Sequence, residues 1–97
     1  MSDPGARKLE LTRKAQRDVR RGGRQDQLQL RKGLKNLVDD AQNLDVKHVS
    51  GKPPWLRLGV GELRVLYRPE DTPAGPRWNV ARVVHRQELD RAVSTLP

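Results

Sequence analysis

The chain contains no cysteine, which excludes disulfides and thiolate metal sites. Its two histidines are 37 positions apart and lie in no metal-binding motif, so we expect no metal site and no cofactor. The first twenty residues hold no apolar run of the kind found in signal peptides, which predicts a cytoplasmic protein. No segment pairs a basic face with a bulky apolar face, so we expect no membrane partner.

Apolar residues are scarce as well. They make up 34% of the 97 residues, and phenylalanine is absent, so the core must be built from Leu, Val, Ala and two Trp. A chain of this length buries enough surface for one core, which predicts a single domain over residues 1–97. Residues 1–8 are polar and contain Pro and Gly, which indicates a flexible end.

Positive charge is abundant. Twenty Lys and Arg stand against 12 Asp and Glu, which gives a net charge of +8 and a pI near 10.8. Such a balance favours polyanions as partners, and nucleic acid first among them.

The first half of the chain predicts a short strand and two helices. Residues 9–12 alternate once between apolar and polar, and Thr12 then suits the N-cap of a basic helix that ends at Gly22 and Gly23. Asp26 is predicted to cap a second helix, whose buried face is formed by Leu30, Leu34, Leu37, Val38 and Ala41. Residues 43–54 are rich in turn formers and are interpreted as a loop with a short helical turn.

From Trp55 the apolar period changes to two. This predicts strands over residues 55–60, 63–68 and 77–86, joined by short turns and therefore antiparallel, followed by a short helix over 87–95. In the last strand, alternation assigns Trp78, Val80, Arg82 and Val84 to one side. The expected fold is α+β, a small antiparallel sheet with two N-terminal helices packed on one face and a short C-terminal helix. We expect arginines to occupy the other face.

Residues 9–93 resemble the RelE/ParE toxin superfamily, the small toxins of bacterial toxin-antitoxin pairs. The resemblance rests on the strand WLRL, the strand GELRVLY and the pair His85-Arg86 at the end of the last strand. It implies a RelE-type mRNA interferase, a ribosome-dependent endoribonuclease that cuts mRNA by metal-free attack of the 2′-hydroxyl. It also implies mRNA and the ribosome with its 16S rRNA as partners, and a cognate acidic antitoxin in a toxin-antitoxin hetero-oligomer.

Site residues follow from the same resemblance. Arg64 matches the strand arginine that contacts the scissile phosphate, and Arg86 matches the arginine that steadies the phosphate or the leaving group. Arg57 stands near the place of a sheet lysine that stabilises substrate charge. Further phosphate contacts are expected from Lys47, Lys52 and Arg82.

One position departs from the family pattern. Many RelE-type toxins carry a catalytic tyrosine four residues after the His-Arg pair, where this chain has Asp90. Loss of an acid or base costs about 10²- to 10⁴-fold in rate. Either His85 or Asp90 substitutes, and we favour His85 because its ordinary pKa lies near neutrality. Otherwise the chain is a weak RNA- or ribosome-binding module, or it belongs to the ParE branch that inhibits DNA gyrase.

Overall fold

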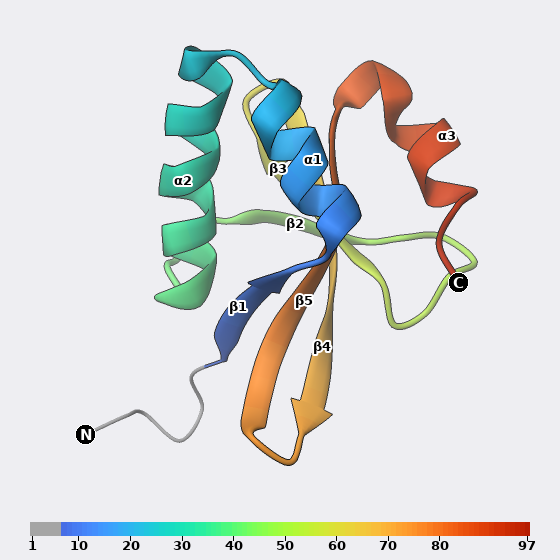
Figure 1. Cartoon of the computed structure of the whole chain (residues 1–97). Helices are drawn as coiled ribbons and strands as arrows, with labels where there is room; N and C mark the ends of the chain where they lie inside the picture. Colours follow the sequence, from blue (N-terminus) through green and yellow to red (C-terminus); the bar gives the residue numbers. More distant parts are fainter. Residues whose placement is uncertain (1–6) are drawn as a thin grey trace.

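The computed structural model describes residues 7–97, which form a five-stranded sheet flanked by helices (Figure 1). The strands lie in the order β1-β5-β4-β3-β2. The elements in chain order are β1 (Lys8–Leu11), α1 (Arg13–Arg21), α2 (Arg24–Val38), β2 (Asp45–His48), β3 (Leu56–Val60), β4 (Leu63–Thr72), β5 (Gly75–His85), a 3-10 turn (Arg86–Glu88) and α3 (Leu89–Val93).

The predicted α+β class is confirmed, together with the antiparallel order of the later strands. β2, β3, β4 and β5 pair with their neighbours in antiparallel fashion. β1 adds a parallel pairing, since Lys8–Leu11 lie beside Arg77–Val80 of β5. The chain returns from β1 to β5 through both helices and the rest of the sheet, and a parallel pair requires such a long connection.

Both N-terminal helices form, and one of their starts differs from the prediction. Thr12 caps α1 as expected, because its side chain accepts a hydrogen bond from the Ala15 amide. α2 begins one turn earlier than expected, with Gly23 at the N-cap, and Asp26 lies in the first turn instead. There it faces the positive end of the helix dipole, which stabilises an acid without a capping bond. Over residues 7–97, no helix has the length and apolar character needed to cross a bilayer.

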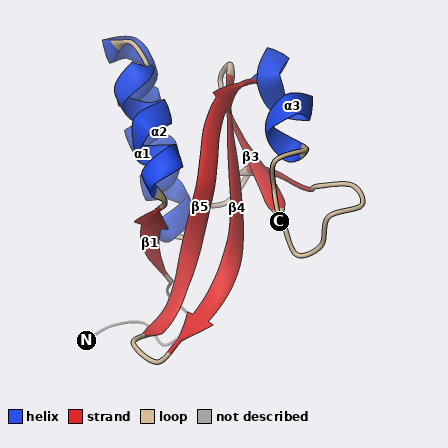
Figure 2. Cartoon of the chain, turned by 45° about the vertical axis from the view of Figure 1, so that its right-hand side comes forward, coloured by secondary structure: helices blue, strands red, loops and turns tan. Residues whose placement is uncertain are grey.

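Helices α1 and α2 lie on one side of the sheet and α3 on the other (Figure 2), and each side has its own apolar cluster. The larger cluster lies between the sheet and α1 and α2, and its buried members are Ala15, Leu30, Leu34, Leu37, Leu58, Leu63, Val65, Tyr67, Val80 and Val83. The smaller one lies on the opposite face, under α3 and the C-terminal residues, and is formed by Val49, Trp55, Leu66, Val84, Ala92 and Leu96. The expectation that arginines alone occupy this second face was therefore wrong, because α3 covers part of it.

A β-bulge changes which side chains of β5 share a face. The register between β4 and β5 shifts at Leu66 and Tyr67, where Leu66 pairs with Arg82 and Tyr67 pairs with Val80. Strict alternation would have placed Val84 beside Val80. Because of the extra residue, Val83 joins Val80 in the larger cluster and Val84 joins the smaller one.

The predicted loop over residues 43–54 contains a strand. β2 pairs with β3 along its whole length, from Asp45 opposite Gly59 to His48 opposite Leu56. All four of its residues are exposed, and β2 is the edge of the sheet. A strand that buries neither face has no alternation of apolar residues to reveal it.

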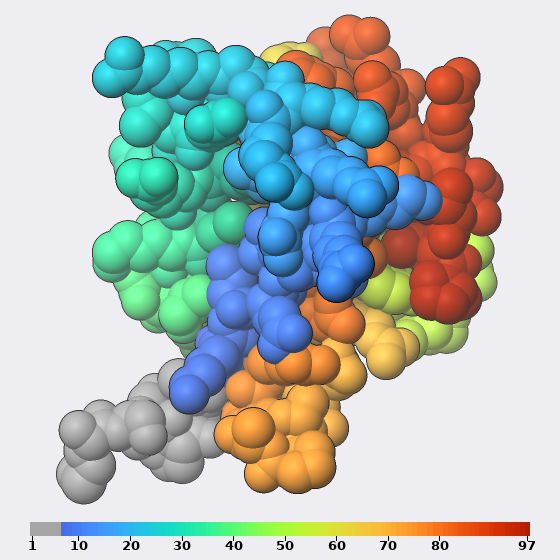
Figure 3. Space-filling model, in the orientation of Figure 1, coloured from blue at the N-terminus to red at the C-terminus, as the bar shows by residue number. Residues whose placement is uncertain are grey.

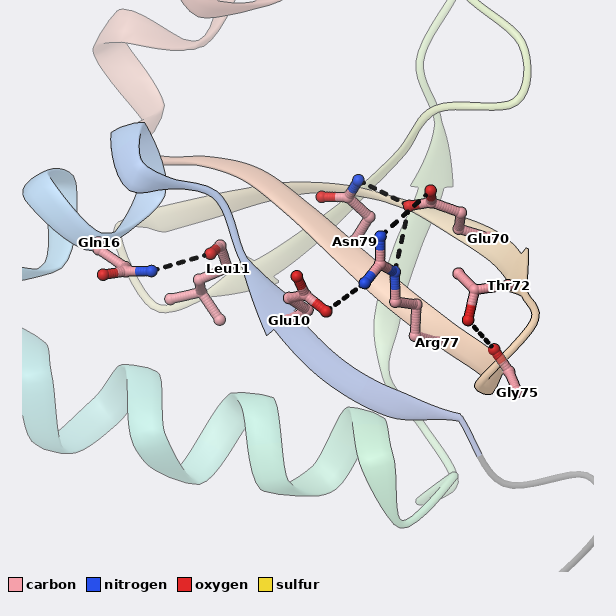
Figure 4. Close-up of polar contacts among 8 residues, drawn as sticks. All are labelled: Glu10, Leu11, Gln16, Glu70, Thr72, Gly75, Arg77 and Asn79. Atoms are coloured by element: carbon pink, nitrogen blue, oxygen red, sulfur yellow. Dashed lines mark hydrogen bonds and ion pairs between the residues drawn. The ribbon is translucent and has the colours of Figure 1, made fainter.

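The long hairpin of β4 and β5 is tied to β1 by a polar network (Figure 4). Arg77 of β5 binds Glu70 of β4 and Glu10 of β1, and Asn79 donates to the same Glu70 carboxylate. These contacts lower the pKa of Glu70, first through the Arg77 hydrogen bond. Arg7 donates to Asp71, and Lys8 opens β1, so these two residues of the predicted flexible end belong to the fold. Residues 1–6 of that prediction lie outside the described residues.

Candidate functional site

Two adjacent rows of cross-strand neighbours bring polar side chains together on the sheet face opposite α1 and α2. In one row Lys47 lies opposite Arg57, which in turn lies opposite Leu66. In the next row Asp45 lies opposite Gly59, which lies opposite Arg64. These residues line one hollow of about 50 Å³, formed by Asp45, Lys47, Arg57, Gly59 and Arg64.

Arg64 is held in this hollow by the turn between β3 and β4. Its Nη1 atom donates to the carbonyl oxygens of Gly61 and Leu63, at 2.9 and 2.8 Å. The guanidinium group has five N–H donors, so others remain for a ligand. Among residues 7–97, no ion pair engages Arg64, Arg57 or Lys47.

Gly59 provides the space that the hollow needs. A Cβ atom at this position would collide with the Asp45 carboxylate and lie 3.4 Å from Arg64 Nη1. Sequence reasoning missed both Gly59 and Asp45, because their proximity depends on the register of three strands. One signal was present, since a glycine inside a strand often marks close approach of another group.

Arg57 also borders a second hollow of about 300 Å³, which reaches α3. Asp90 lines this hollow together with Arg57, His48, Val49, Ser50, Leu89 and Val93. Asp90 therefore lies on the same side of the sheet as the three cations, in the region that α3 covers.

Arg86 lies beside the turn that holds Arg64. Its amide donates to the Glu62 carbonyl and its Nε lies 2.8 Å from a Glu62 carboxylate oxygen. Glu62 follows Gly61, whose carbonyl accepts from Arg64. Arg86 does not line the hollow around Arg64, and its side chain is 61% exposed.

Three other predicted site residues are engaged elsewhere. His85 pairs with Leu63 on the helix-covered side, where its Nε2 lies 3.1 Å from Asp26 of α2. Arg82 donates through Nε and Nη2 to Asp18 of α1, at 2.8 and 3.1 Å, and this carboxylate raises the pKa of Arg82. Lys52 donates to the carbonyl of Leu96 near the C-terminus. None of these three lines either hollow that Arg57 borders.

The single tyrosine does not replace the residue missing at position 90. Tyr67 is 1% exposed and packs in the larger cluster, with its ring edge against Trp78. Burial raises the pKa of Tyr67 to about 12, so its hydroxyl keeps its proton at neutral pH. Its position beneath the helices removes it from the cationic face.

The geometry suits an anion with several oxygen atoms. Arginine forks meet phosphate oxygens in pairs and stay charged at any physiological pH. Lys47, Arg57 and Arg64 approach one hollow from three adjacent strands, so a phosphate there would meet cations on more than one side. Asp45 and Asp90 supply carboxylates within the same surface.

Comparison with known proteins identifies a shared fold. No protein-family model and no curated protein matches the sequence. Among solved structures, a chain of the RelB-RelE antitoxin-toxin complex from Methanococcus jannaschii matches with a TM-score of 0.66 and 16% sequence identity. The match covers 84% of this chain and 95% of that one. The chain thus has the fold of a component of a toxin-antitoxin complex.

Proposed function

We propose that this chain is the toxin of a toxin-antitoxin pair and that it cleaves mRNA on the ribosome. The observation that carries the proposal is the hollow in which Lys47, Arg57 and Arg64 meet without ion-pair partners among residues 7–97. The shared fold with a RelB-RelE component supports the same assignment. Ribosomes carry out translation in the cytoplasm, where the proposed activity would take place.

The proposed reaction is an in-line transfer within the RNA strand. The ribose 2′-oxygen attacks the adjacent phosphorus, the bond from phosphorus to the 5′-oxygen breaks, and a 2′,3′-cyclic phosphate and a 5′-hydroxyl result. A base accepts the 2′-hydroxyl proton and an acid donates a proton to the leaving 5′-oxygen. Arg64 and Arg57 would hold the phosphate oxygens while negative charge develops on them, and Arg86 would meet the strand beside them.

Asp90 is the better candidate for proton transfer in this arrangement. It shares a hollow with Arg57, whereas His85 lies across the sheet against Asp26. A carboxylate beside a substrate phosphate can accept the 2′-hydroxyl proton. We therefore assign the base to Asp90, and His85 to the junction between β5 and α2.

Mapping of mRNA cuts in a translating extract tests the proposal. Purified wild-type protein should produce ribosome-dependent cuts, and Arg64→Ala should reduce cleavage by about 10²- to 10³-fold, as loss of one charge-stabilising donor does. Asp90→Asn should reduce it by about 10²- to 10⁴-fold. Arg91→Ala is the matched control, because Arg91 is an exposed arginine of α3 that lines neither hollow.

Three results would count against this function. Intact transcripts with wild-type protein would remove the nuclease, and inhibition of DNA supercoiling in the same preparation would favour the gyrase-directed alternative. Ribosome binding without any cut would leave a binding module that has lost the chemistry.

The antitoxin would dock in a groove between α2 and β1. The groove has an apolar floor and a volume of about 450 Å³. Arg31 and Lys35 are among its lining residues. β1 is an edge strand that pairs only with β5 in the described part of the chain, so its outer edge can accept another strand. Charge complementarity favours an acidic, amphipathic segment. The apolar side chains that would receive it are Leu9, Leu11, Val19, Leu30, Leu34 and Val38.

Co-purification with the product of the neighbouring reading frame tests this partner. Wild-type protein should retain a small acidic protein, and Val38→Glu should lose it because a carboxylate would enter the groove. Leu28→Glu is the control, since Leu28 is 54% exposed on α2 and does not line the groove. Equal retention by both variants would exclude the groove as the docking site.

A further inference from the structure

Helix α1 carries a charge pattern that opposes its own stability. Five of its nine residues are basic, namely Arg13, Lys14, Arg17, Arg20 and Arg21, and Arg24 opens the next helix. All six are exposed. Several stand three or four residues apart, as in Arg13 to Arg17 and Arg17 to Arg21, and like charges at these spacings repel.

The start of α1 is unfavourable in a second way. Arg13 and Lys14 occupy the first turn, which holds no acidic residue. The helix dipole places partial positive charge at that end, so cations there are destabilising. Arg20 and Arg21 in the last turn do suit the dipole, so stability of the helix does not explain the cations of its first turn.

No internal partner accounts for the six cations. In the part of the chain that the structure describes, none of them forms an ion pair. The single acid of α1, Asp18, is turned inward, where it accepts from Arg82 Nε, Arg82 Nη2 and the Val83 amide. Its side chain is only 6% exposed, so it leaves the outer charge unneutralised.

Contacts on its inner side hold α1 in place despite this repulsion. Ala15 is fully buried, and the Thr12 hydroxyl donates to the Ala81 carbonyl at 3.0 Å while it caps the helix. Asp18 adds a polar contact to β5, because it accepts hydrogen bonds from Arg82 and from the Val83 amide. The outer side of α1, which crosses the middle of the face in Figure 3, thus has cations as its only exposed charged residues.

We propose that the outer face of α1, with Arg24, binds the phosphate backbone of a folded RNA at a place separate from the candidate cleavage site. Separation follows from the fold, because α1 packs on the sheet face opposite Lys47, Arg57 and Arg64 (Figure 2). The cations are spread along the helix rather than gathered in one hollow, and only Arg21 borders one, which suits sequence-independent contact with phosphates. The choice of RNA rests on the proposed function. In that function the face with Lys47, Arg57 and Arg64 binds mRNA, and the outer face of α1 binds a structured RNA of the kind found in the ribosome.

The size of the surface fits such a contact. From Arg13 to Arg21 the helix rises about 12 Å. A duplex with the charge density of DNA carries about seven phosphate charges over that length, and α1 with Arg24 offers six cations against them.

Binding of an RNA duplex by two variants of equal net charge tests the inference. The α1 variant combines Arg13→Gln, Arg17→Gln and Arg20→Gln, and the control combines Lys8→Gln, Lys32→Gln and Arg91→Gln, all exposed and outside α1. Each lowers the net charge by three from +8. The probe is a labelled RNA duplex of roughly 20 base pairs, measured by fluorescence anisotropy from about 50 to 200 mM salt.

We expect the α1 variant to bind on the order of tenfold or more weakly than the control at low salt. The slope of log affinity against log salt should also become shallower by roughly two to three, one unit for each lost phosphate contact. In the absence of RNA, the α1 variant should melt a few degrees higher than wild type, because repulsion within the helix is relieved. A merely structural role for these arginines predicts the opposite shift.

Equal affinities and slopes for the two variants would overturn the inference, as would a wild-type protein that binds anionic vesicles but no duplex. The duplex is not cleaved in this assay, so the result is independent of the mRNA cuts. If Arg64→Ala abolishes cleavage while the α1 variant binds like the control, only the second RNA contact fails. If the α1 variant alone loses duplex binding and wild type cuts no mRNA, only the nuclease fails.

Discussion

Basic side chains on the two sides of the sheet differ in whether they have acidic partners. On the helix-covered side His85 meets Asp26 of α2, and Arg82, whose cross-strand partner Leu66 lies on the other face, reaches past the edge of β5 to Asp18 of α1. On the other face Lys47, Arg57 and Arg64 share a hollow with Asp45, and among residues 7–97 they form no ion pair. The first arrangement joins elements of the fold, and the second leaves charge available to a ligand. Substitutions on one face should therefore change stability, and substitutions on the other should change function.

The largest effect is expected at the centre of the helix-covered core. Leu58 is 1% exposed, and Leu58→Ala should lower the free energy of unfolding by about 2–5 kcal/mol, because it removes apolar contacts and leaves a cavity. Urea denaturation measures the loss. Leu28→Ala, on the exposed side of α2, should change stability by less than about 0.5 kcal/mol. Similar losses in both variants would mean that the core does not lie where the two clusters place it.

A pair of acids compares the two faces directly. Asp18→Ala should cost about 3 kcal/mol, because it leaves the mostly buried Arg82 guanidinium and the Val83 amide without their acceptor. Asp90→Ala should leave stability within about 0.5 kcal/mol, since Asp90 is exposed and forms no ion pair in the described chain. Denaturation measures both, and cleavage assays should show a loss for Asp90→Ala. If Asp90→Ala unfolds the chain and Asp18→Ala does not, the roles of the two faces are reversed.

The elements that could be predicted from sequence are those with one buried face. The spacing of Leu30, Leu34 and Leu37 marked α2, and alternation marked β3 and β4. β2 was missed because all of its residues are exposed, and the bulge in β5 was missed because neither Ala81 nor Arg82 signals one. A single extra residue inverts the alternation beyond it, and so the sides of Val83 and Val84 were misassigned.

The candidate site was predictable to a similar extent. Alternation placed Arg57 and Arg64 on one face, where they do meet in one hollow. Asp45 and Gly59 escaped because their meeting depends on cross-strand register, which no local pattern encodes. The engagement of Arg82 with Asp18 depends on how α1 packs across β5, and this also lies beyond local pattern.

Gly59 offers a test of the hollow with little effect on the fold. A methyl group at position 59 would displace the Asp45 carboxylate and crowd Arg64, while the β3 backbone needs no change. A misplacement of about 1 Å can cost about 100-fold in rate, so Gly59→Ala should reduce mRNA cleavage by about that factor. Gly23→Ala is the control, because nothing lies within 4 Å of the added atom. Full activity in Gly59→Ala would separate the hollow from the reaction.

The smallest effect is expected in the β4–β5 hairpin, at the polar network around Glu70, away from both the helix-covered core and the cationic hollow. Hydrogen bonds from Arg77 and Asn79 hold the pKa of Glu70 below its ordinary value of 4.5, so the ionised carboxylate stabilises the fold above that pH. This contribution is lost as the pH falls through the lowered pKa of the folded state. Glu70→Gln should therefore be slightly less stable than wild type at pH 7, and the difference should shrink below about pH 4.5. Glu88→Gln, an exposed acid without an ion pair in the described chain, should show no such convergence. Thermal melting of the three proteins from neutral to acid pH measures the effect, and a constant difference between Glu70→Gln and wild type would show that the network does not depend on the charge of Glu70.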